Sequence, residues 1–122
     1  MNKLEVGMYV RFNYHRVTVP IQISKIKEKH YEDIERYYYY LTDNGLVISE
    51  AQILKASHNI IDLIEVGDYA NGCKVTSKDQ FLGFGNYDWY MTNDEIKSIV
   101  TKEQFEAMEY KVESEVKSIW NI

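Results

Sequence analysis

The sequence predicts a mainly β fold (α+β) of two tandem small SH3-like β units with short helices, packed as one compact body. The first observation is a repeated phrase: Leu-Glu-Val-Gly-Met-Tyr-Val at residues 4–10 returns as Ile-Glu-Val-Gly-Asp-Tyr-Ala at residues 64–70. Such self-similarity is the signature of two copies of one structural unit. The second is period-two alternation of apolar residues in short runs bounded by turn residues. The third is the apolar, linker-free junction at residues 60–65, so we expect the two units, 1–63 and 64–122, to pack against each other.

Strand signals dominate the first unit. Residues 6–12 alternate in polarity, and residues 17–23 place Val and Ile on one face at period two. Pro20 falls on the opposite face of that run and cannot donate to a ladder, which predicts an edge position. The charge-rich residues 25–36 fit either a long hairpin connection or a short helix. Four consecutive tyrosines make residues 36–41 strongly β-prone.

A hairpin and short helical turns complete the first unit. Asn44-Gly45 is a strong hairpin signal because both residues tolerate positive φ, and residues 46–48 form the returning strand. Residues 49–55 are compatible with a helix or a loop. Ser57 can cap a short turn of helix over residues 59–63.

The second unit repeats this plan in shorter form. We expect strands at residues 64–70 and 73–76, joined by a tight turn at Asn71-Gly72, and a strand at residues 87–91 that corresponds to the tyrosine run.

A capped helix follows in the second unit. Thr101 and Gln104 have the spacing of a capping box, which predicts a helix that ends near Glu109 and buries Phe105 and Met108 on one face. Residues beyond it predict a closing strand at 110–112 and a docked terminal helix at 113–122.

The composition limits the possible functions. Nineteen acidic and fourteen basic residues give a net charge of −5, so the chain lacks the positive charge for tight binding of duplex DNA. It could instead face a basic protein surface, or compete with nucleic acid for one. Cys73 is the only cysteine, which excludes an intrachain disulfide. We find neither a signal peptide nor a long apolar run, so we expect a soluble, cytoplasmic protein with no membrane partner.

No catalytic constellation is predicted, so we expect a non-enzymatic protein with no cofactor and no metal. Gly83-Phe84-Gly85 lacks the third glycine and the lysine of a phosphate loop. Cys73 begins an apolar strand, which is more typical of a structural residue than of a nucleophile. His30 lies near three acids and could hold a weakly bound metal, but a solvated charged loop is the simpler interpretation. The sequence leaves open whether His30 or Cys73 has a role beyond structure.

The clustered aromatic residues are the best candidates for a binding surface. Strand alternation places two of the tyrosines 37–40 on each face, and residues 87–90 repeat this arrangement. Amphipathic rings beside acids are typical of protein-recognition surfaces, although cross-strand packing explains any individual ring as well. The partner-binding residues that we predict are Glu35, Tyr38, Tyr40, Asp43, Asp88 and Trp89.

Part of the chain resembles known proteins. Residues 59–69, 71–72, 99–106 and 110–112 resemble a group of small, mostly uncharacterised proteins encoded in phages and prophages of Gram-positive bacteria. The resemblance covers residues 55–112 and implies a genomic setting rather than an activity. Small acidic accessory proteins of phages are often inhibitors of host defence, including anti-CRISPR proteins. The resemblance brings no catalytic residues with it.

The favoured functional hypothesis combines this resemblance with the acidic, tyrosine-rich composition. We expect a phage or prophage accessory protein that inhibits a host defence factor by direct binding, such as an anti-CRISPR protein that blocks Cas9. Effectors of that kind hold nucleic acid in strongly basic channels, which an acidic surface could occupy. Two alternatives stay open. One is an SH3-like adaptor or structural phage component that binds a peptide or self-assembles. The other is a single-stranded nucleic-acid binder that uses Lys25, Lys27 and Lys29 beside the rings, or a minor enzyme with a metal near His30. The sequence does not define the partner or the oligomeric state.

Overall fold

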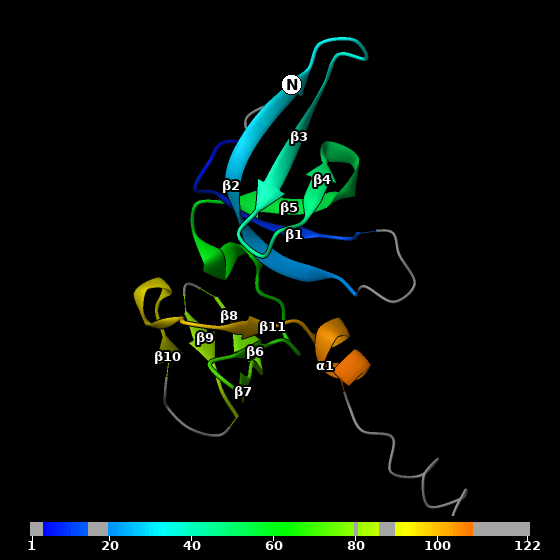
Figure 1. The fold of residues 1–122 in the computed structure, drawn as a ribbon. Helices are drawn as coiled ribbons and strands as arrows, with labels where there is room; N and C mark the ends of the chain where they lie inside the picture. Colours follow the sequence, from blue (N-terminus) through cyan, green and yellow to red (C-terminus); the bar gives the residue numbers. More distant parts are fainter. Residues whose placement is uncertain (1–3, 15–19, 80, 86–89, 109–122) are drawn as a thin grey trace, which may run out of the picture.

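A computed structural model describes residues 4–14, 20–79, 81–85 and 90–108 of the chain. In these ranges the protein is mostly β, with one α-helix and three 3₁₀ turns (Figure 1). The strands are β1 (Tyr9–Phe12), β2 (Gln22–Glu32), β3 (Tyr37–Thr42), β4 (Val47–Ser49), β5 (Ile53–Ser57), β6 (Tyr69–Ala70), β7 (Cys73–Lys74), β8 (Ser77–Lys78), β9 (Leu82–Gly83), β10 (Tyr90–Met91) and β11 (Ile99–Val100). The helical elements are η1 (Glu50–Gln52), η2 (Ile60–Leu63), η3 (Asn93–Glu95) and α1 (Lys102–Met108).

The first half forms one antiparallel sheet in the order β4-β3-β2-β1-β5. One face of this sheet covers the first core. In β3 the buried residues Tyr40 and Thr42 alternate with more exposed ones, whereas in β1 Val10, Arg11 and Phe12 are all buried, because Arg11 on the opposite face packs against the second half. The core members are Val10, Phe12, Ile26, Tyr40 and Ile48. β1 pairs only with residues 22–25 of β2, and β4 pairs only with residues 39–41 of β3. The outer parts of β2 and β3 therefore continue past the sheet as a two-stranded arm, which points away from the second half (Figure 1).

The second half consists of two small antiparallel sheets, in the orders β10-β9-β8 and β11-β6-β7. They enclose a second core, which includes residues of η2 from the end of the first half. Its buried members are Ile61, Ile64, Ala70, Val75, Leu82, Phe84 and Met91. Ile23 of β2 packs against this same core, so the two halves share apolar contacts.

The repeated phrase adopts the same local structure twice. Gly7 and Gly67 have φ of +96° and +102°, a region that favours glycine. In the first copy the N–H of Gly7 donates to the carbonyl of Ile26 at 2.9 Å, and the N–H of Ile26 donates to the carbonyl of Met8 at 2.8 Å. In the second copy the N–H of Gly67 donates to the carbonyl of Val75 at 2.9 Å, and the N–H of Val75 donates to the carbonyl of Asp68 at 2.8 Å. The two copies of the phrase therefore have equivalent local structure, but around each glycine this structure is a turn and not the strand that the sequence predicts.

The order of elements also repeats around these turns. In each half a capped 3₁₀ turn leads into a strand that pairs antiparallel with the half's first strand: η1 leads into β5, and η3 leads into β11. The capping bonds correspond as well. The N–H of Ser49 donates to Gln52 at 2.8 Å, and the N–H of Thr92 donates to Glu95 at 3.2 Å.

A buried ion pair joins the two halves. Arg11 of β1 is fully buried, and its guanidinium donates to the carboxylate of Asp68 at 2.6 and 3.3 Å. It also donates to the main-chain carbonyl of Leu63 at 3.1 Å and to Glu103 at 3.2 Å, and its Nε lies 3.4 Å from Glu65. Burial alone would lower the pKa of Arg11, but the Asp68 hydrogen bond and the three nearby carboxylates raise it above its ordinary value. The expected packing of two halves as one body is therefore anchored by charge as well as by apolar contact.

The capping box predicted near the end of the chain is confirmed. The N–H of Thr101 donates to the side chain of Gln104, and the N–H of Gln104 donates to the hydroxyl of Thr101, both at 3.0 Å. The Thr101 hydroxyl also donates to the carbonyl of Ile21 at 2.6 Å, which ties the start of α1 to the first half. The expected burial of Phe105 and Met108 is wrong. Met108 is 67% exposed, and Phe105 stacks one ring face on Tyr69 while the rest of its side chain stays exposed.

Several predicted elements differ in extent. The segment 25–36 is a strand and a hairpin turn, because β2 continues to Glu32, so its helical alternative is wrong. The strands expected at 6–12 and 64–70 begin only at Tyr9 and Tyr69, because the glycine turn occupies the residues before them. Residues 17–19, 87–89 and 110–122, with the expectations placed on them, lie outside the described residues. None of the helices in the described ranges has the length and apolar character that a membrane crossing needs.

Candidate functional site

The strongest candidate surface is the projecting arm, defined here as residues 28–39 of β2, β3 and the turn between them. Tyr31 pairs with Tyr38 and Glu32 pairs with Tyr37 across the two strands. Because no third strand flanks this part of the arm in the described residues, the rings stay open to solvent: Tyr31 is 46% exposed and Tyr38 is 37% exposed. Exposed rings on a projecting hairpin distinguish the arm from the two cores.

Two tyrosines and a lysine form one face of the arm. The rings of Tyr31 and Tyr38 lie with their centres 4.8 Å apart and are tilted by 57°. The ammonium of Lys29 lies 4.7 Å from the centre of the Tyr38 ring, a cation–π contact. Cross-strand contacts of this kind hold the rings in place before any partner arrives, which reduces the entropy lost on binding.

The opposite face carries a histidine and two further rings. His30 stacks on Tyr39 with ring centres 5.1 Å apart, and Tyr37 lies 6.2 Å from Tyr39. The Nε2 of His30 lies 2.8 Å from the carboxylate of Glu28. A shallow groove of about 300 Å³ begins beside these rings and reaches η1. Its lining residues are Tyr37, Tyr39, Val47, Ile48, Ser49 and Gln52.

The tip of the arm presents an apolar side chain to solvent. Ile34 is 90% exposed, the highest value among the exposed large hydrophobic residues in the described part of the chain. The carboxylate of Glu32 accepts the N–H of Ile34 at 2.8 Å, and Arg36 turns the chain with a left-handed φ of +57°. The turn therefore holds Ile34 outward although burial would be favourable.

The charges of the arm are unevenly distributed. Over residues 25–39, which are the arm and the three residues of β2 before it, four acids face four bases, so this longer segment has no net charge. The acids are Glu28, Glu32, Asp33 and Glu35, and the bases are Lys25, Lys27, Lys29 and Arg36. Between residues 32 and 36, however, three of these acids accompany only one base, which makes the tip negative by two charges. The predicted acidic surface is thus limited to the tip.

The structure brings only some of the predicted site residues together. Glu35 and Tyr38 both lie exposed on the arm. Tyr40 is a wrong prediction as a contact residue, because its side chain is completely buried in the first core and its hydroxyl donates to Glu50 at 3.2 Å. Asp43 is exposed but follows the opposite end of β3, about 20 Å of strand away from Glu35. Asp88 and Trp89 lie outside the described residues.

Sequence reasoning missed the residues that mark the arm most clearly. Alternation correctly places Tyr38 and Tyr40 on one face of β3, but it does not show that the core ends between them. The sequence pattern of alternation does not single out Tyr31 and Ile34, because they lie within a charged run. The sequence nevertheless contains a pattern that marks both residues. Each is a large apolar side chain among acids and bases, with no apolar residue two positions before or after it.

The surroundings of His30 and Cys73 concern the two residues for which the sequence left a chemical role open. Within the described ranges, histidine, cysteine and carboxylate side chains form no group of three or more that could hold a metal ion. His30 meets Glu28 and the Tyr39 ring. Cys73 is half-buried and packs against the second core, as expected of a structural residue.

The comparisons with known proteins add no relative. No family model, no curated protein and no solved structure matches the chain. The functional argument therefore depends on the arm and on the physical chemistry of its side chains.

Proposed function

We propose that the protein is a non-enzymatic binding protein that contacts a partner protein through its arm. The observation that supports this most is the gathering of Tyr31, Tyr37, Tyr38 and Ile34, all exposed, on a hairpin that stands clear of both cores. Exposed apolar and aromatic side chains that lie side by side are characteristic of interaction surfaces, and tyrosine is among the commonest interface anchors. A rigid aromatic side chain also loses little conformational entropy when it becomes buried.

We further propose that the partner is a host defence protein with a basic, nucleic-acid-binding channel, such as the CRISPR effector Cas9. Two considerations support this proposal: the resemblance to phage and prophage proteins, and the negative charge of the arm tip. Such channels hold a guide–target duplex by its backbone and are strongly positive. In this proposal the tip enters the channel, the tyrosines bury against its walls, and nucleic acid is excluded. The protein would act in the cytoplasm of the host bacterium.

A second candidate function is that of a tandem SH3-like adaptor that holds a peptide. Two observations favour it. In the first half β1 pairs with both β2 and β5, and a capped 3₁₀ turn precedes β5, an arrangement consistent with the SH3-like architecture. The groove lined by Tyr37 and Tyr39 lies beside that turn and could hold an extended segment. The corresponding order of elements in the second half supports two such units.

A binding panel separates these functions. Purified effectors, with and without guide RNA, are titrated with the wild-type protein and with Tyr31→Ser/Tyr38→Ser at low and moderate salt. Leu54→Ser is the matched control, because Leu54 is equally exposed but lies on β5, away from the arm. Interface tyrosines that act as hot spots are worth about 2 kcal/mol each, so we expect the arm variant to lose affinity by a factor of about 30 or more while the control binds as the wild type does.

Other outcomes of the same panel would contradict the proposal. If no effector binds under any of these conditions, the proposed partner is wrong. If an effector binds the arm variant as tightly as the wild type, the arm is not the contact surface. Saturable binding of proline-containing or other peptide arrays, or a stable homo-oligomer by mass measurement, would favour the adaptor. Binding of single-stranded oligonucleotides with a steep salt dependence would favour nucleic acid.

A further inference from the structure

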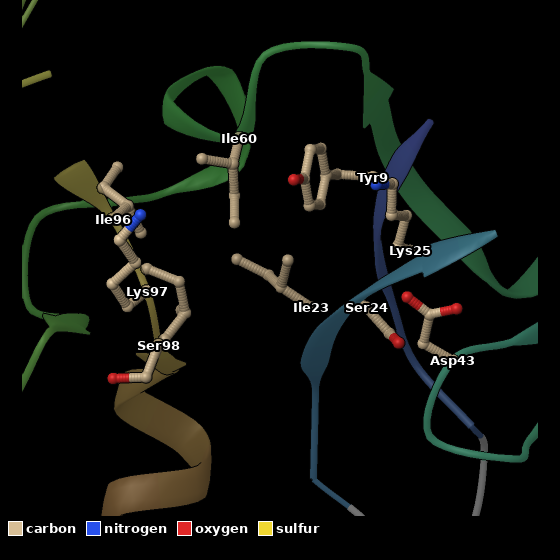
Figure 2. Close-up of a pocket in the computed structure, with 10 residues that line it drawn as sticks. Tyr9, Ile23, Ser24, Lys25, Asp43, Ile60, Ile96, Lys97 and Ser98 are labelled. Carbon is tan, nitrogen blue, oxygen red and sulfur yellow. The ribbon is translucent and has the colours of Figure 1, made fainter. Parts of the chain in front are cut away.

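A cavity of about 350 Å³ lies between the two halves (Figure 2). This volume is within the range of pockets that bind ligands. Its apolar lining consists of isoleucines from four different elements or loops, and Figure 2 shows Ile23 and Ile60 extending into the same space. The four residues are Ile23, Ile60, Ile96 and Ile99. Each is only partly buried and packs against the second core on its inner side, so its outer side is available to a ligand.

Hydrogen bonds between the two halves hold the walls of the cavity in place. The side chain of Asn93 accepts the N–H of Ile61 and donates to Asn59, both at 3.0 Å, and so fixes η3 against η2. The Thr101 hydroxyl donates to the carbonyl of Ile21, which fixes the end of β11 against the start of β2. A pocket whose walls are already fixed binds without the cost of ordering them.

The rim of the cavity is polar and carries a positive excess. Lys25 and Lys97 lie on it together with one acid, Asp43, so the rim has one net positive charge in a chain of net charge −5. Lys97 donates to the main-chain carbonyl of Asp94 at 3.1 Å, and the ammonium of Lys25 lies 5.5 Å from the centre of the Tyr9 ring. Neither lysine forms an ion pair with a carboxylate of the described residues. The ammonium of Lys97 can therefore accept an anionic partner.

We propose that this cavity binds a peptide segment of a partner protein in which a large aliphatic side chain stands next to a carboxylate. The aliphatic side chain occupies the space between the isoleucines, and the carboxylate meets Lys97 at the rim, because the ammonium of Lys25 already contacts the Tyr9 ring. The apolar contact supplies most of the affinity, and the charge selects among sequences. This site does not depend on the arm, and Tyr31→Ser/Tyr38→Ser should leave it unchanged.

Methyl NMR tests the proposal directly. The full chain is labelled at its isoleucine methyl groups and titrated with acetyl-Gly-Leu-Glu-Gly-amide, and with peptides that carry Gln or Lys in place of Glu, or Ala in place of Leu. We expect saturable shifts at the four cavity isoleucines with the Leu-Glu peptide. The Gln peptide should bind about two- to fivefold more weakly, which is the factor for one exposed ion pair. The Lys peptide should bind more weakly still, and the Ala peptide should not saturate.

Three variants make the test specific to the cavity. Lys97→Glu should remove the preference for the Leu-Glu peptide over the Gln peptide, whereas Lys74→Glu, an equal charge change at an exposed residue of β7 outside the cavity, should preserve it. Ser98→Trp should fill the mouth and abolish the shifts. The proposal is overturned if the four isoleucines do not respond to the Leu-Glu peptide, if the Ala peptide binds equally well, or if Lys97→Glu and Lys74→Glu behave alike.

Discussion

Removal of the Asp68 carboxylate is the sharpest test of how the two halves hold together. Asp68 is completely buried and accepts four hydrogen bonds. Two come from the guanidinium of Arg11, at 2.6 and 3.3 Å. The others come from the main-chain N–H groups of Glu65, at 2.7 Å, and of Lys102, at 2.9 Å. Asp68→Ala would leave Arg11 buried, with only the partly exposed Glu65 and Glu103 near its charge.

The expected cost follows from the burial of this pair. Loss of one partner from a buried ion pair costs about 3–5 kcal/mol, because the other charge stays desolvated. That is a large fraction of the total stability of a small domain, which is about 5–15 kcal/mol. The double variant Arg11→Met/Asp68→Ala should be more stable than Asp68→Ala alone, because it removes the unpaired charge and keeps an apolar side chain in its place.

Urea unfolding followed by tryptophan fluorescence and circular dichroism measures these differences. With an m-value of about 1–3 kcal/mol/M, Asp68→Ala should lower the midpoint by roughly 2 M. Glu106→Ala is the control, because Glu106 is exposed on α1 and its removal should change stability by less than about 0.5 kcal/mol. If Asp68→Ala unfolds at the wild-type midpoint, or if the double variant is no more stable than the single one, the reasoning about the buried pair is refuted.

Three further predictions concern single positions. Gly83→Ala should lower the free energy of unfolding in urea by about 1–3 kcal/mol, because the added Cβ would clash with the hydroxyl of Ser77. Ser77→Ala in the same chain should restore most of this loss. If it restores none, the steric explanation is wrong. Thr101→Ala should cost about 1–2 kcal/mol, because α1 loses its cap, and a wild-type midpoint would show that the cap is dispensable. The hydrogen bond from Lys102 is the main reason that the pKa of Glu65 lies below its ordinary value of 4.5. A carboxyl whose pKa is lowered by folding stabilises the protein above about pH 4.5, and this contribution is lost as the pH falls. Glu65→Gln should therefore reduce the decrease in stability between about pH 6 and pH 3, and an unchanged decrease would contradict the assignment.

Local signals predicted local structure well. Gly7 and Gly67 occupy equivalent turns because the repeated phrase encodes a backbone conformation that glycine favours. The capping box at Thr101 begins a helix at the predicted residue, because the two reciprocal hydrogen bonds involve side chains only three positions apart. The capping box depends on neighbours in the sequence, so the sequence alone was sufficient to predict it. The repeat indicated that the two copies correspond, but their residues around each glycine were predicted as strand and form a turn.

The same local signals do not predict contacts between residues that lie far apart in the sequence. Tyr38 and Tyr40 share a face of β3, yet one is exposed and the other is buried, because the neighbouring strand β4 pairs with β3 only as far as Tyr39. Nothing in a run of tyrosines indicates where the adjacent strands stop. The alternation of residues 6–12 predicts that Arg11 lies in a strand, but its pairing with Asp68 depends on how the two halves meet. Whether a predicted site residue is exposed or buried therefore depends on neighbouring strands that are distant in the sequence, and these the sequence pattern does not place.

Amide hydrogen exchange tests the central claim, that the arm is the binding surface, most directly. The chain is measured alone and after saturation with an effector from the binding panel, beginning with Cas9 with and without its guide RNA. We predict that residues 28–39 become strongly protected in the complex, while the exposed strand β5 exchanges as it does in the free protein. A complex in which these residues exchange at their free rate, or the absence of a complex with every effector tested, would contradict the account.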